Sequence, residues 1–141
     1  MKNLDPVATQ QYIDKADHFF HAMRLLADDL QSYRTSIALL AVHSAISLND
    51  AITVGLTGKR GKSQDHSAAA TELEKLAKKS HLKALQGVQH LRWLLGQKSK
   101  ISYQADHLDD AKILMAVDRA EKFNAWAYNY FKEILRVQAV T

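Results

Sequence analysis

The chain has 141 residues, of which 47% are hydrophobic and 24% are charged, and its net charge is +4. This composition is typical of a globular protein and excludes collagen-like, low-complexity and disordered chains, and the length suits one domain over residues 1–141. The absence of cysteine excludes disulfides and thiol nucleophiles, and the positive charge favours anionic partners.

Apolar residues recur at three- and four-residue steps along most of the chain, which is the pattern of amphipathic helices. Asp5 and Pro6 suit a capping residue and a first helical residue, so they predict the start of the first helix. Gly58 and Gly96 are expected to end the second and fourth helices, and Ser80 is expected to cap the fourth. The predicted helices run from 6 to about 31, from about 32 to 55–58, from 66 to about 79, from about 80 to 96 and from 106–110 to about 135.

No segment shows the alternating pattern of a strand, and no repeat of fixed period is present. The sequence therefore predicts an all-α fold, an up-down helical bundle of four to five helices joined by short loops. No segment has the apolar run of a signal peptide or the ~18 uninterrupted apolar residues of a membrane helix. We therefore expect a cytoplasmic protein without membrane contact.

Polar residues lie on the second predicted helix, which is otherwise apolar. His43 and Asp50 share one stripe by helical spacing, and Asn49 is adjacent to it. One interpretation is that these side chains bond to the backbone or to a neighbouring helix. In the other, Asp50 faces the following loop and orients Arg60 or His66.

The loop after the second helix combines cations with a histidine at a helix start. Arg60 offers a planar fork to phosphate oxygens, Lys62 adds a second cation, and the imidazole of His66 exchanges a proton near neutral pH. In RNA hydrolysis one such group stabilises charge on the phosphate while the other moves a proton. The alternative is a solvated basic loop with His66 as an ordinary first-turn residue.

A second basic segment follows the predicted fourth helix. Lys98, Lys100 and Tyr103 are expected in a loop, where the cations contact an anion and the phenol stacks on a base, or where Tyr103 packs beneath the loop. The histidines show no metal-ligating spacing, since His18 and His21 lack further ligands nearby. We expect neither a metal site nor a cofactor.

Taken together, the segment 41–52, the loop from Arg60 to His66 and the stretch from Lys98 to Tyr103 resemble the HEPN-domain family over roughly residues 33–131. The resemblance implies a small helical bundle, usually a homodimer, in a superfamily with metal-independent RNA-cleaving toxins and defence nucleases and many inactive binding members. In the nucleases an arginine and a histidine open the last long helix. Here Lys98 and Tyr103 take those places, and the Arg60 and His66 pair lies one connection earlier.

These features predict an RNA- or nucleotide-binding module that does not catalyse a reaction. One alternative is a metal-independent endoribonuclease that uses Arg60, His66 and Asp50. Another is a dimeric scaffold for protein interactions. The expected partners are RNA or a nucleotide, a second copy of the chain, and a partner protein such as a nucleotidyltransferase or an antitoxin.

Overall fold

In the computed structural model, residues 2–60, 66–80, 85–103 and 108–137 are described. These residues form five α-helices and one π-helical turn and contain no strand, which confirms the predicted all-α bundle. The elements are α1 (Pro6–Ala27), α2 (Leu30–Thr57), α3 (His66–Lys79), α4 (Gln86–Tyr103), α5 (Asp110–Tyr130) and η1 (Phe131–Leu135).

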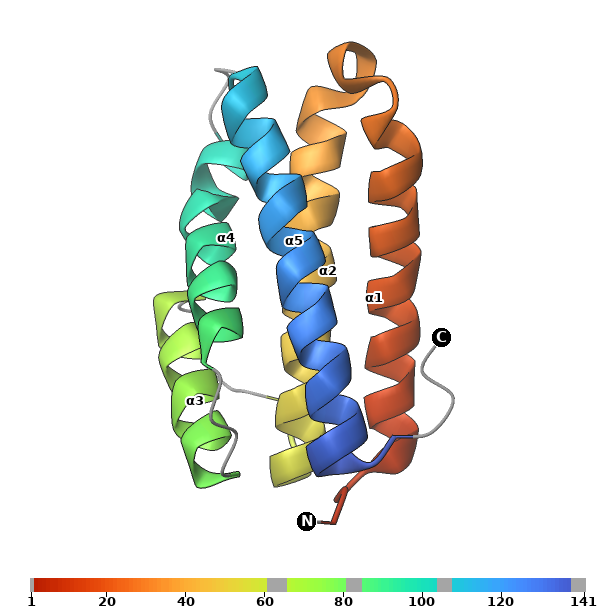
Figure 1. Cartoon of the computed structure of the whole chain (residues 1–141), viewed down its shortest axis with the longest axis vertical. Helices are drawn as coiled ribbons and strands as arrows, with labels where there is room; N and C mark the ends of the chain where they lie inside the picture. The colour runs from red at the N-terminus through yellow and green to blue at the C-terminus, as the bar shows by residue number, and fades with distance from the viewer. Residues whose placement is uncertain (1, 61–65, 81–84, 104–107, 138–141) are drawn as a thin grey trace.

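The helix α2 is central to the bundle, since it contacts α1, α3, α4 and α5 (Figure 1). Its length and hydropathy would suffice to cross a membrane, but 67% of its most apolar window is buried inside the protein. Small residues let the neighbouring helices approach it closely, and their side chains are fully buried. The buried alanines of α2 are Ala38, Ala41, Ala45 and Ala51.

The boundary between the first two helices lies earlier than predicted. Asp5 caps α1 as expected, because its Oδ1 accepts a hydrogen bond from the Ala8 amide at 3.0 Å. However, α1 ends at Ala27, and Asp29 caps α2 by accepting from the Ser32 amide at 3.3 Å. The aspartate cap starts a first turn before the predicted position 32, and a kink at Tyr33, whose φ of −131° is not helical, separates this turn from the rest of α2.

The prediction that Gly96 ends the fourth helix is wrong. The helix α4 continues to Tyr103, and Ile101 in its last turn is buried with 8% exposure. A glycine inside a helix costs only about 0.5–1 kcal/mol, which burial of an apolar side chain readily offsets. Lys98, Lys100 and Tyr103 are therefore helical residues and not loop residues.

Ser80 does not cap α4, because it lies at the end of α3. Its hydroxyl donates to the Leu76 carbonyl at 2.8 Å and accepts from the Tyr130 hydroxyl at 2.6 Å. The cap of α5 is Asp109, which accepts from the Lys112 amide at 2.8 Å. The bond between Ser80 and Tyr130 joins the end of α3 to α5. The Asp109 cap fixes where α5 begins.

Candidate functional site

Asp50 and Arg60 meet where the chain leaves α2. Gly58 ends the helix with a φ of 76°, in the left-handed region, and the Lys59 amide donates to the Thr57 hydroxyl at 3.3 Å. This turn brings Arg60 back along the helix, so that its Nε lies 3.5 Å from Asp50 Oδ2. The interpretation in which Asp50 orients Arg60 therefore has the geometry that it requires.

The two partners of this ion pair differ in their exposure. The side chain of Asp50 is 16% exposed, whereas that of Arg60 is 65% exposed. Burial raises the pKa of Asp50, although the positive charges of Arg60 and Lys15 act in the opposite direction. Asp50 thus holds one edge of the guanidinium from within the protein, while the rest of the group faces solvent.

The guanidinium has donors left for a ligand. The ion pair with Asp50 is made through Nε of Arg60, and among the described residues no hydrogen bond is found for its two Nη groups. An arginine held at one edge presents a planar pair of donors whose geometry matches two phosphate oxygens. The arrangement suits recognition of an anion.

Two other predicted residues of α2 do not join this pair. His43 lies seven residues before Asp50, about 10 Å along the helix, and its ring packs on Phe19 at 5.8 Å between centroids. Asn49 Oδ1 is buried, and the described residues offer it no hydrogen-bond partner. His43 therefore lies against the neighbouring helix α1 through this ring contact.

The residues proposed to act with Arg60 in the following loop lie outside the part of the chain that the structure describes. Lys62 is outside the described residues. The backbone of His66 begins α3, and its side chain is also outside the described part of the chain. The spacing of Arg60 and His66 is therefore a feature of the sequence alone.

The second basic segment lies at the opposite end of the bundle from Arg60. Figure 1 shows that α4 ends at the same end of the bundle at which α2 starts, whereas Arg60 follows the end of α2. Lys100 is exposed, and Tyr103 is 85% exposed, so the phenol does not pack under a loop. Within one chain, Lys98, Lys100 and Tyr103 do not share a site with Arg60.

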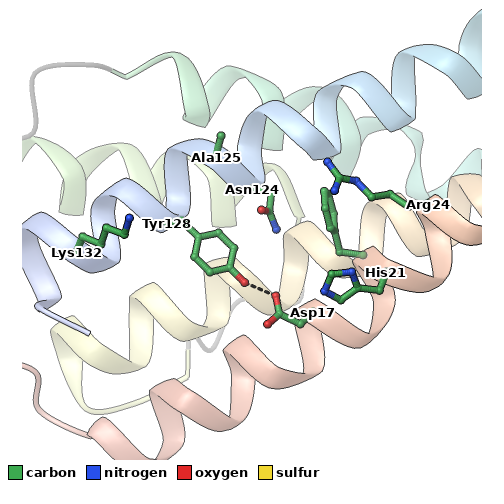
Figure 2. A pocket seen from close by; sticks show the side chains of 8 residues that line it. Asp17, His21, Arg24, Asn124, Ala125, Tyr128 and Lys132 are labelled. Carbon is green, nitrogen blue, oxygen red and sulfur yellow. Dashed lines mark hydrogen bonds between the residues drawn. The ribbon is translucent and has the colours of Figure 1, made fainter. Parts of the chain in front are cut away.

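A pocket between α1 and α5 was not predicted. It encloses about 330 Å³, and Figure 2 shows Asp17 and Tyr128 pointing toward each other, with Arg24 at one end and Lys132 at the other. Its lining residues are Asp17, Phe20, His21, Arg24, Asn124, Ala125, Tyr128 and Lys132.

The Tyr128 hydroxyl donates a hydrogen bond to Asp17 Oδ1 across this pocket. Burial, followed by the bond and the charge of Asp17, raises the pKa of Tyr128, so the phenol stays protonated in neutral solution. This protonation makes Tyr128 a hydrogen-bond donor and not a nucleophile. The pair joins α1 to α5.

The remaining polar groups of the pocket are partly committed to other contacts. Arg24 lies over the Phe20 ring at 4.6 Å and bonds Glu121 at 3.2 Å. Asn124 Nδ2 is buried without a hydrogen-bond partner among the described residues. The signal for this pocket was present in the sequence, because both helices carry polar residues at helical spacing. These residues are Asp17, His21 and Arg24 on α1, and Asn124 and Tyr128 on α5 with Lys132 in the following η1.

Within the described residues, no group of three or more His, Asp or Glu side chains could hold a metal ion. No family model, curated protein or solved structure matches the chain. The candidate site is therefore described by its geometry alone, and one of the two interpretations of the sequence had proposed that Asp50 lies beside Arg60.

Proposed function

We propose that this protein is an HEPN-like module that binds RNA or a nucleotide through Arg60 and does not cleave it. The proposal rests on the guanidinium of Arg60, which Asp50 holds at one edge while the rest faces solvent. Asp50 holds Nε at 3.5 Å, while 65% of the Arg60 side chain remains exposed. A positioned guanidinium loses less conformational freedom when it binds a phosphate, and phosphate contacts supply most of the affinity of nonspecific nucleic-acid binding.

Binding is favoured over cleavage by the residues at the end of α4. By the family resemblance, Lys98 and Tyr103 stand where nucleases carry an arginine and a histidine. An ammonium is a point charge without the fork of a guanidinium, and neither residue type ordinarily exchanges a proton near neutral pH. At these positions the module therefore lacks the arginine and histidine pair that the resemblance associates with RNA cleavage.

A homodimer is part of this proposal. The exposed apolar side chains include two neighbours on the first half of α5, Leu114 at 58% and Met115 at 39%. Burying such residues against a second copy would remove apolar surface from water. Light scattering should then report twice the mass of the chain, and a monomer at every concentration would contradict the dimer.

The test measures binding and cleavage in the same samples. A fluorescent single-stranded RNA of about 20 nucleotides is titrated with protein in EDTA, and anisotropy and gel electrophoresis follow binding and cleavage. Arg60→Ala should weaken binding about fivefold or more and reduce the slope of log K against log salt by about 0.7. The matched control is Lys79→Ala, which removes one positive charge from the exposed end of α3 and should bind as the parent does.

Two results would change the conclusion. Equal affinity of Arg60→Ala and the parent would contradict a role for Arg60. Cleavage by the parent that is lost in His66→Ala would instead support the endoribonuclease, with Arg60, His66 and Asp50 as its catalytic residues.

A further inference from the structure

The surface of α4 is positively charged without compensation from its own helix. Residues Gln86–Tyr103 include Arg92, Lys98 and Lys100 but no aspartate or glutamate. The helix packs against α5, whose cations Lys112, Arg119 and Lys122 are matched in number by the carboxylates Asp110, Asp118 and Glu121. The excess of cations on α4 itself favours an anionic partner.

Two cations of α5 lie over the indole ring of Trp93 on α4, which is half-buried against the core. The Lys112 ammonium is 6.0 Å from the centre of the indole ring, and the Arg119 guanidinium carbon is 5.8 Å from it. Lys112 and Arg119 are seven residues apart, so they share one face of α5 and are separated by about 10 Å along the helix axis. An aromatic ring flanked by cations is the arrangement with which proteins hold a base and its neighbouring phosphates.

Arg119 differs from the other arginines in its partners. Within the described residues Arg119 has no ion-pair partner, and its Nη1 lies 3.1 Å from His90 Nδ1. Since a guanidinium only donates, His90 Nδ1 accepts this bond and carries no proton. The positive charge of Arg119 is therefore positioned without being neutralised.

The acidic groups near this surface each have a cation as partner, and one of these cations, Arg92, belongs to α4 itself. Asp118 pairs with Lys122 at 3.0 Å, and Glu74 of α3 lies 3.8 Å from Arg92. Within the described part of the chain, no carboxylate lies within ion-pair distance of Lys112. Burial and the charges of Arg119 and Lys122 lower the pKa of His90, which keeps the imidazole in the neutral form that Arg119 requires.

We propose that the α4–α5 face formed by His90, Trp93, Lys112 and Arg119 binds single-stranded RNA, with a base stacked on Trp93 and with phosphates contacted by Lys112 and Arg119. This inference rests on the proposed function and names the form of RNA and the surface that binds it. A single strand fits better than a duplex because its bases are free to stack on an aromatic side chain. An acidic peptide would use the cations but would leave the indole without a role.

The experiment compares three variants by anisotropy with a labelled uridine oligonucleotide of about 15 residues. Trp93→Leu should weaken binding by about fivefold or more, since base stacking contributes about 1–3 kcal/mol per base. Arg119→Gln should weaken it similarly and reduce the salt slope by about 0.7. The control is Arg24→Gln, an exposed arginine between α1 and α5, which should retain the affinity of the parent.

Intrinsic fluorescence gives a second readout that does not depend on losing affinity. The chain has two tryptophans, and Trp126 packs among aromatic rings of α5. With excitation selective for tryptophan, RNA should quench the parent protein, and it should not quench Trp93→Phe, in which Trp126 is the remaining tryptophan. Quenching of equal size in both proteins would overturn the stacking on Trp93.

The outcomes separate this inference from the proposed function. If Trp93→Leu and Arg119→Gln bind RNA as the parent does while Arg60→Ala does not, the α4–α5 face is excluded and the function stands. If the parent binds duplex RNA as tightly as the single strand, stacking on Trp93 is excluded. If the parent binds no RNA, both proposals fail.

Discussion

The α-carbon of Gly87 lies against the indole ring of Trp126, where α4 packs on α5. Any Cβ at position 87 would overlap ring atoms of this indole. The ring is itself confined, because it stacks on Phe123 at 5.7 Å and lies 5.5 Å from the Tyr130 ring. The close approach of the two helices therefore depends on the absence of a side chain at Gly87.

Gly87→Ala should destabilise the protein by about 1–3 kcal/mol, the cost of forcing one methyl group into a packed interior. Urea unfolding followed by circular dichroism measures this change. The matched control lies in the same helix, because a Cβ at exposed Gly96 would meet nothing within 4 Å. Gly96→Ala should instead stabilise the helix by about 0.5–1 kcal/mol, and equal effects of the two substitutions would refute the packing argument.

Without the Tyr128 hydroxyl, the free energy of unfolding should change less with pH in the alkaline range. Because burial and Asp17 raise the pKa of Tyr128, the folded state favours the neutral phenol. This contribution is fully present below the ordinary value of 10.0 and is lost as the pH rises above it. Tyr128→Phe should cost about 1–2 kcal/mol at neutral pH, and the difference from the parent should narrow toward pH ~11. Urea unfolding at several pH values checks this, and a constant difference would show that the phenol does not titrate as described.

Asp50→Asn should weaken RNA binding without lowering the free energy of unfolding. Because burial raises the pKa of Asp50, the stability contributed by the neutral carboxyl is present at low pH and is lost as the pH rises through that raised value. The amide removes the buried charge, so the free energy of unfolding of the variant at pH 7 should equal or exceed that of the parent. RNA affinity should fall by about threefold to tenfold, since Arg60 is no longer held. A variant that is less stable but binds RNA unchanged would contradict both parts.

The helices could be predicted because their signals are local. Asp5, Pro6 and Gly58 act on the backbone within a few residues of themselves, and the structure places them as expected. The prediction that Gly96 ends α4 fails because a glycine ends a helix only where the chain turns. At this position burial of Ile101, five residues later, keeps the chain helical.

The candidate site could be predicted only where its parts are close in the sequence. Asp50 and Arg60 are ten residues apart and joined by one turn, so helical spacing was enough to propose their contact. The bond between Asp17 and Tyr128 spans 111 positions and depends on how α1 and α5 pack. Single-sequence periodicity shows that each of these helices has a polar stripe, but not which two stripes face each other.

Gly55, near the end of α2, contacts residues that lie near both ends of the described chain. Its carbonyl accepts a hydrogen bond from the Leu4 amide at 2.8 Å, and the side chain of Leu135 fills the space where a Cβ would lie. Leu135 is synthesised more than a hundred residues after Leu4. During translation Thr9 of α1 can reach Gly55 early, but the space that Leu135 fills stays open until η1 has emerged from the ribosome.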